Sequence, residues 1–299
     1  MLNRSKLMVL IALMICVTPS FAAEEKTAGY WLGQSMDYFL NGSYDLCLLC
    51  IDKYLDMDPS NFLAWFIKGS ALSSLGKYDD SVDCFDKALQ IDPEDATAWA
   101  FKGIALVGQG KYDDSVDCFD KALQIDPEDV TAWGGRGQVL YIQGKYADAI
   151  ACYGKALQID PENAGVWNNK GLALEDQGNY DDAIDCYDNA LQINPENAGA
   201  WCNKGNALID QDNYDDAVDC FNKALQVDPE YANAWNNKGI TLAFQGKYDD
   251  AIDCFDKSLQ IDPESAKAWY GKGLTFQAQG KYVDANDCFD KAEQLGFSV

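Results

Sequence analysis

The chain has 299 residues, of which 48% are hydrophobic, and it carries a net charge of −25 from 23 basic and 48 acidic residues. A surface this acidic repels phosphate backbones and anionic lipid head groups, which argues against nucleic acid as a partner. The chain has no histidine. It therefore lacks the commonest metal ligand and the commonest general base.

Residues 1–22 have the pattern of a secretory signal peptide. A basic segment at residues 3–6 precedes an apolar run from Leu7 to Val17, and the small-x-small sequence Ser20-Phe21-Ala22 follows. The apolar run is shorter than the roughly 20 residues of a membrane-spanning helix. We predict cleavage after Ala22 or Ala23, a secreted or extracytoplasmic mature chain, and no membrane insertion of that mature chain. An uncleaved segment would instead anchor the chain in a membrane.

The tryptophans reveal an internal repeat of 34 residues. Successive tryptophans are all separated by this distance: Trp31, Trp65, Trp99, Trp133, Trp167, Trp201, Trp235 and Trp269. A fixed period of this size indicates a solenoid, a propeller or another array. We predict eight tandem repeats over residues 28–299, starting at residues 28, 62, 96, 130, 164, 198, 232 and 266.

Each repeat has the pattern of two helices joined by a turn. In the third repeat, Trp99, Gly103 and Leu106 fall on one face of a first helix. Gly110 follows where that helix should end, because glycine tolerates positive φ. Asp113-Asp114 then suits the positive end of a second helix.

The second helix should end at Asp126-Pro127-Glu128. We expect Asp126 to cap the next first helix and Pro127 to lie in its first turn, where a missing N–H costs nothing. No strand-like alternation occurs between these segments, so the pattern predicts helices alone.

The fourth repeat shows the fixed positions of the unit as Trp133, Arg136, Gly137, Leu140, Ala149, Tyr153, Ala156 and Pro161. These positions resemble the signature of the tetratricopeptide repeat (TPR) family, and the resemblance covers residues 28–299. It implies an all-α fold, a right-handed superhelical solenoid of eight helix-turn-helix units. The seventh position departs from the family's usual leucine, since it is basic, as at Lys102. We expect its stem to cover apolar surface while its head reaches water or a neighbouring aspartate.

The resemblance also implies a concave groove, lined by the first helices, that binds partner segments. First helices differ more from one another than second helices do. Groove positions carry Ile104, Tyr141, Asn168, Asn169, Asn203, Asn206, Asn236 and Asn237. A carboxamide donates and accepts hydrogen bonds, so such a series can hold an extended peptide by its backbone. Glu175, Asp176 and Asp210 would favour a basic peptide. Alternatively, asparagine is simply the family's common residue at the sixth position.

Cysteine recurs at position 23 of every repeat, as Cys50, Cys84, Cys118, Cys152, Cys186, Cys220, Cys254 and Cys288. Packed helices lie about 8–10 Å apart, and a disulfide needs Cα atoms within about 7 Å. We therefore interpret these cysteines as packing residues. We predict no metal site, because cysteines spaced one per repeat do not lie close enough together to bind one ion. Cys47 and Cys50 form a C-x-x-C pair without the strand and helix of a thioredoxin motif.

These features predict a non-catalytic scaffold or adaptor that binds a protein or an extended peptide outside the cytoplasm. The sequence has neither a nucleophile elbow nor a phosphate-binding loop, so we expect no enzymatic activity and no cofactor. The alternative is a structural solenoid that self-associates in a surface assembly. Against end-to-end stacking, the last repeat carries the polar residues Asn286 and Glu293.

Overall fold

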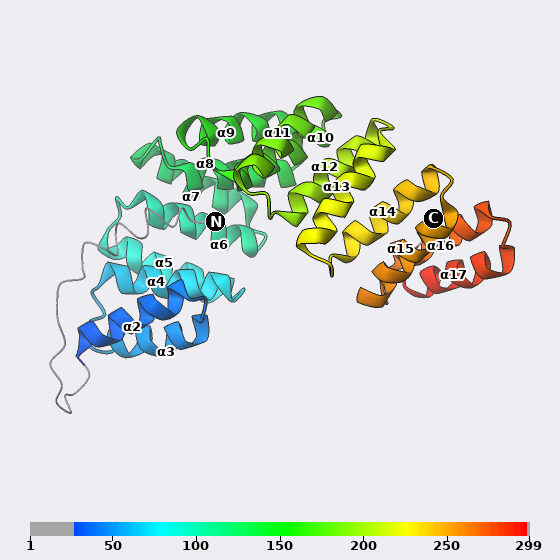
Figure 1. Cartoon of the computed structure of the whole chain (residues 1–299). Helices are drawn as coiled ribbons and strands as arrows, with labels where there is room; N and C mark the ends of the chain where they lie inside the picture. Colours follow the sequence, from blue (N-terminus) through cyan, green and yellow to red (C-terminus); the bar gives the residue numbers. More distant parts are fainter. Residues whose placement is uncertain (1–26, 298–299) are drawn as a thin grey trace. The chain divides into compact units, whose positions relative to one another are not determined.

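The computed structural model describes residues 27–297, which form sixteen α-helices and no strand within that range (Figure 1). The predicted signal peptide lies outside the described residues. The chain divides between Pro161 and Glu162 into two compact units. In both units the helices follow one another as helix-turn-helix pairs, as the sequence predicts.

The first unit contains α2 (Ala28–Leu40), α3 (Tyr44–Leu55), α4 (Phe62–Ser74), α5 (Tyr78–Ile91), α6 (Ala96–Gly108), α7 (Tyr112–Ile125), α8 (Val130–Ile142) and α9 (Tyr146–Ile159). The second unit contains α10 (Ala164–Glu175), α11 (Tyr180–Ile193), α12 (Ala198–Asp210), α13 (Tyr214–Val227), α14 (Ala232–Phe244), α15 (Tyr248–Ile261), α16 (Ala266–Ala278) and α17 (Tyr282–Gln294). Even-numbered helices are the first helices of the repeats, and odd-numbered helices are the second.

The turn inside each pair needs a residue with positive φ. Gly110, between α6 and α7, has φ of +74°, as predicted from its place after the first helix. In the pair α12–α13 the same place is taken by Asp212, with φ of +58°. Aspartate is among the few residues that tolerate this conformation.

The turn between pairs differs from the prediction. Asp126 follows α7, and its side chain accepts a hydrogen bond from the Glu128 backbone N–H at 3.0 Å. Pro127 lies in this turn, before α8 begins. The N-cap of α8 is Asp129, which accepts from the Ala132 N–H at 2.9 Å. The expectation that Asp126 caps α8 was wrong because its carboxylate closes the turn, so a second polar residue must satisfy the helix.

A large ring packed between small residues holds the helices of each pair together. The ring of Phe119 on α7 is fully buried. A Cβ atom built on Gly103 of α6 would lie 2.7 Å from this ring, and one on Gly135 of α8 would lie 2.4 Å from it. Glycines on two neighbouring first helices therefore leave room for one large ring between them.

The substitution Gly103→Ala tests this packing. We expect it to lower the free energy of unfolding by about 1–3 kcal/mol, because the ring cannot move away from one glycine without meeting the other. As a control, Gly154→Ala lies on α9 with nothing within 4 Å of the added carbon. That change should instead stabilise the helix by up to about 1 kcal/mol. Urea unfolding of both variants checks the result, and equal effects would contradict the packing argument.

In at least six repeats the tryptophan connects its first helix to the turn before it. The indole Nε1 of Trp99 donates a hydrogen bond to the carbonyl oxygen of Pro93 at 2.9 Å. Equivalent bonds of 2.8–3.1 Å form at Trp65, Trp133, Trp201, Trp235 and Trp269. The direction in which each of these first helices leaves its turn is thus fixed by a side chain one turn into the helix.

The basic residue at the seventh position extends this connection to the preceding second helix. Lys102 places its Nζ 5.4 Å from the centre of the Trp99 ring and 2.6 Å from Asp86 Oδ1. The same ion pair forms in four more repeats: Lys68–Asp52, Arg136–Asp120, Lys204–Asp188 and Lys272–Asp256. The expectation that these side chains reach a neighbouring aspartate is confirmed at these five positions.

First and second helices are packed differently. Within each unit the first helices of neighbouring repeats contact one another, as α6 contacts α8 and α12 contacts α14. Within either unit, neighbouring second helices of the described residues do not approach within 8 Å between Cα atoms. Each unit therefore presents one continuous layer of first helices, which we call the first-helix layer. Between residues 27 and 297, no helix combines the length and apolar character that a membrane span requires.

The last repeat closes with its own C-terminal residues. The ring of Phe297 stacks on Tyr270, with 4.6 Å between centroids. Asn286 and Glu293 are exposed on α17, which confirms the predicted polar outer face at these two positions.

Candidate functional site

The asparagines of the second unit form hydrogen-bonded pairs on the first-helix layer. The Asn237 Nδ2 on α14 donates to Asn206 Oδ1 on α12 at 2.8 Å. The Asn203 Nδ2 on α12 donates to Asn168 Oδ1 on α10 at 3.0 Å. The structure therefore brings these four predicted residues together across neighbouring repeats. Asn169 is half-buried on the same layer.

A small hollow lies where α12 and α14 meet. It has a volume of about 180 Å³ and is lined by Asn206, Ile209, Asp210, Asn237 and Ile240. The two isoleucines give it an apolar part, the paired carboxamides supply donors and acceptors, and Asp210 is exposed. Such a mixture can hold one side chain of a ligand and its adjoining peptide group.

Asn236 occupies a different place from its neighbour Asn237. Its side chain is only 8% exposed, and its Nδ2 donates to Asn237 Oδ1 at 3.0 Å. Its Oδ1 is buried without a hydrogen-bond partner in the described residues. The expectation that Asn236 lines the groove surface is therefore corrected: position five of this repeat faces the packed interior.

The two predicted residues of the first unit also belong largely to packing. Ile104 on α6 lies against the core cluster that contains Phe119. The ring of Tyr141 on α8 contacts that of Tyr146, with 5.7 Å between centroids. Both side chains are half-buried. They present part of their surface on the first-helix layer of their own unit.

Glu175 is a carboxyl group with an altered ionisation near this site. It ends α10 and accepts a hydrogen bond from the Tyr187 Oη at 2.5 Å. Burial raises its pKa from 4.5 to about 7, the Tyr187 hydrogen bond opposes this, and the charges of Asp210 and Asp176 raise it further. Near neutral pH, Glu175 therefore exchanges between a neutral and a charged form.

This ionisation predicts a pH-dependent stability that Glu175→Gln removes. The pKa of about 7 in the folded chain lies above the 4.5 of an ordinary glutamate. Between pH 4.5 and 7 the folded chain therefore binds more protons than the unfolded chain. The stability of the wild type relative to Glu175→Gln should fall, by at most about 3 kcal/mol, as pH rises from 4.5 to 7. Urea unfolding of both proteins across that range measures it. The exposed Glu196→Gln is the control, and a pH-independent difference for Glu175→Gln would contradict the assignment.

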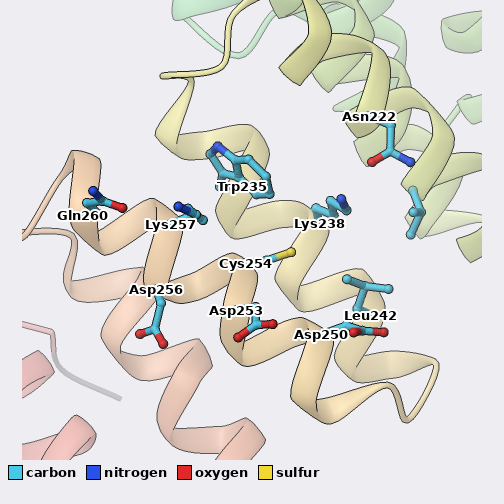
Figure 2. A pocket seen from close by; sticks show the side chains of 11 residues that line it. Asn222, Trp235, Lys238, Leu242, Asp250, Asp253, Cys254, Asp256, Lys257 and Gln260 are labelled. Atoms are coloured by element: carbon cyan, nitrogen blue, oxygen red, sulfur yellow. The ribbon is translucent and has the colours of Figure 1, made fainter.

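A second, larger pocket lies on the side of the second helices (Figure 2). It has a volume of about 600 Å³, and α13, α14 and α15 line it. Lys238 points into it from α14, with its Nζ 5.3 Å from the centre of the Trp235 ring. Asn222 lies on α13 at the position where five other repeats have the aspartate that pairs with the basic residue of the next repeat. Lys238 forms no ion pair with any described residue.

The charges around this pocket are mixed. Its lining includes Lys238 of α14 and, on α15, Lys257 together with Asp250, Asp253 and Asp256 (Figure 2). These carboxylates leave the lining without an excess of positive charge, so it offers no anion a clear electrostatic advantage. We therefore locate the candidate site on the first-helix layer and not here.

The cysteines are buried and unpaired in the described part of the chain. Burial raises the pKa of the Cys47 thiol to about 12, with contributions from Cys50 and Asp52. Burial likewise raises the pKa of Cys84 to about 11, although Lys68 opposes the shift. Because the thiolate is the nucleophile and the metal ligand, such thiols are poorly reactive. Within residues 27–297 no three Cys, Asp or Glu side chains group in a way that could hold a metal ion.

Comparison with known proteins identifies the class of the fold as a helical repeat array. A family model described as tetratricopeptide repeat matches residues 62–95, 96–129, 164–197, 198–231 and 232–265. A second model of that description matches residues 118–151 and 254–285, and a TPR repeat model matches residues 137–178. The chain belongs to the tetratricopeptide repeat family. Its fold is typical of non-catalytic scaffolds for protein–protein interaction.

Solved structures agree with this assignment, whereas no curated protein sequence matches the chain significantly. YrrB, described as a TPR protein with an unusual peptide-binding site, is 26% identical with a TM-score of 0.53, over 64% of this chain and 98% of YrrB. Cut9 in the APC/C Cut9–Hcn1 hetero-tetramer is 19% identical with a TM-score of 0.67, over 92% of this chain and 54% of the other. PilF of Pseudomonas aeruginosa is 22% identical with a TM-score of 0.61, over 68% and 93%. The last two likenesses concern the fold alone.

Ile209 and Ile240 are the lining residues of the hollow that the sequence analysis did not single out. They occupy positions 12 and 9 of their repeats, which the family resemblance already assigns to the groove. Attention to apolar residues at those positions, and not only to asparagine, would have identified them.

Proposed function

We propose that the chain is an extracytoplasmic scaffold that holds an extended segment of a partner protein on the first-helix layer of its second unit. The observation that carries this proposal is the hollow between α12 and α14. Its lining combines paired carboxamides, apolar side chains and one exposed carboxylate.

The contacts of the hollow suit a peptide backbone with one side chain inserted. Asn206 and Asn237 hydrogen-bond each other across 2.8 Å, and each keeps further donor and acceptor capacity for a peptide group. Ile209 and Ile240 favour the aliphatic part of a ligand side chain. Asp210, together with the ionisable Glu175, favours a basic ligand, as does the net charge of −25.

The likeness to YrrB supports peptide binding as the kind of interaction. That structure is described as having an unusual peptide-binding site, and nearly all of it is covered by the match. TPR proteins use one fold for many partners, so the fold gives the class of interaction and the side chains of the layer give its selectivity.

The double variant Asn206→Ala/Asn237→Ala tests the site. The mature chain (24–299) is immobilised, partners are captured from an extracytoplasmic extract of its own cells, and the shortest binding peptide of each is mapped. We expect the double variant to bind that peptide at least about tenfold more weakly, since it removes carboxamides at the centre of the contact. Removing both asparagines together breaks their mutual bond without leaving either one unpaired. Because Asn236 also loses its acceptor on Asn237, the helicity of the variant is compared with that of the wild type.

Asn189→Ala/Asn222→Ala is the matched control, because it removes two asparagines from the second helices α11 and α13. It should bind as the wild type does. Equal weakening by the two double variants, with equal helicity, would place binding away from the first-helix layer. Equal affinity of the test variant and the wild type would show that the asparagine pairs serve packing alone.

The extracytoplasmic location rests on residues 1–22 and has its own test. We expect the chain recovered from its cells to begin at residue 23 or 24 by N-terminal sequencing, and to be found outside the cytoplasmic membrane. A chain that begins at Met1 and fractionates with membranes would indicate the uncleaved anchor. A cytosolic chain would contradict the proposal.

A further inference from the structure

Two leucines on α3 are exposed where the other repeats carry acids. Leu46 is 45% exposed and Leu49 is 61% exposed. The residues equivalent to Leu46 in the seven later repeats are all aspartates, and those equivalent to Leu49 are aspartates except for Ala151. The later repeats serve as a comparison within the same chain, and only the first repeat carries leucine at these two positions.

These positions face the place where a preceding repeat would pack. In the seventh repeat they are Asp250 and Asp253 of α15, and they line the pocket whose opposite wall is α13 of the repeat before (Figure 2). No described helix precedes α2 and α3. On α2, Tyr30 is 42% exposed, whereas its equivalents Ala64 and Ala98 are fully buried.

The two ends of the repeat array differ in the side chains that they expose. Terminal repeats of solenoids usually have a polar outer face, which keeps them soluble. The last repeat exposes the polar Asn286 and Glu293 on α17, together with the apolar Val283, which is 76% exposed. In the first repeat, α3 exposes Leu46 and Leu49. A head-to-tail contact between these two ends would leave a free end on each copy and continue into open-ended oligomers, whereas a face that pairs with a copy of itself closes after two.

The charges that flank the leucines fit such self-pairing. Asp45 and Lys53 are both exposed, and each lies four residues from Leu49 along α3. If two copies of α3 cross antiparallel with Leu49 opposite Leu49, Asp45 of each copy faces Lys53 of the other. The Lys53 Nζ is already placed, 4.2 Å from the centre of the Trp31 ring. The face is therefore complementary to itself in charge as well as in polarity.

We propose that the chain forms a two-fold homodimer through the α3 face made of Asp45, Leu46, Leu49 and Lys53. A two-fold contact uses the same face on both copies and closes after two. The face is small, so the dimer is weak and depends on concentration. The net charge of −25 repels the two copies, and added salt strengthens the dimer by screening that repulsion.

Sedimentation velocity over a range of chain concentrations tests the proposal. We expect a reversible monomer–dimer equilibrium for the wild type and a dimer at least about tenfold weaker for Leu46→Asp/Leu49→Asp, because two apolar contacts become like charges. The variant carries the residues that six later repeats have at both positions, so it should fold with unchanged helicity. Val283→Asp is the control, because it also replaces an exposed apolar residue by the aspartate of other repeats, but on α17.

A charge exchange tests the antiparallel pairing. Lys53→Asp should weaken the dimer, because the new aspartate at position 53 of each copy then faces Asp45 of the other. Asp45→Lys/Lys53→Asp should restore the dimer. Three results would overturn the proposal: a wild type that is monomeric throughout, a dimer unchanged by Leu46→Asp/Leu49→Asp, or open-ended oligomers. The chains 1–299 and 24–299 are compared, and dimerisation of only the shorter one would show that residues 1–23 cover the face instead.

Discussion

The hydrogen bond from a tryptophan indole to a proline carbonyl, which forms in at least six of the eight repeats, is the contact on which the repeat geometry depends. In the third repeat Trp99 reaches back to Pro93 at 2.9 Å. Lys102 then lies over the same indole and pairs with Asp86 on the preceding second helix. One aromatic side chain therefore fixes the turn, the direction of the first helix and the ion pair to the previous repeat. Because the contact recurs, neighbouring first helices meet as a continuous layer, and the candidate site forms where two of them touch.

The sequence predicts the repeat because its strongest constraints are local and are repeated. The 34-residue spacing recurs along the chain, and the glycine after the first helix can be recognised within one repeat. The structure confirms that glycine at Gly110, which has φ of +74°. The prediction that Asp126 caps α8 was wrong because the sequence gives no chemical difference between Asp126 and Asp129. Only the hydrogen bond from the Glu128 N–H to Asp126 shows which of them belongs to the turn.

The candidate site could be predicted only in part, since it depends on contacts between repeats. Asn236 and Asn237 are identical neighbours in the sequence, yet the first is 8% exposed and the second lines the hollow. Their positions in the repeat assign both residues to the groove. The packing of the helices instead buries Asn236 and leaves Asn237 at the surface of the layer. The pairing of Asn237 with Asn206 joins side chains 31 residues apart, which no pattern within one repeat reveals. The pKa of Glu175 likewise depends on other helices: burial raises it, the hydrogen bond from Tyr187 of α11 opposes the rise, and the charge of Asp210 on α12 adds to it.

The buried cysteines have a consequence for how the chain must fold. Each thiol is protected only while its own repeat is formed, and an unfolded chain would expose all of them to oxidation and mispairing. Contacts in a repeat array are close in sequence, so such chains fold quickly for their length. In an oxidising compartment, the yield of correctly folded chain is thus a competition between two rates: local helix pairing, which hides a thiol, and disulfide formation, which captures it.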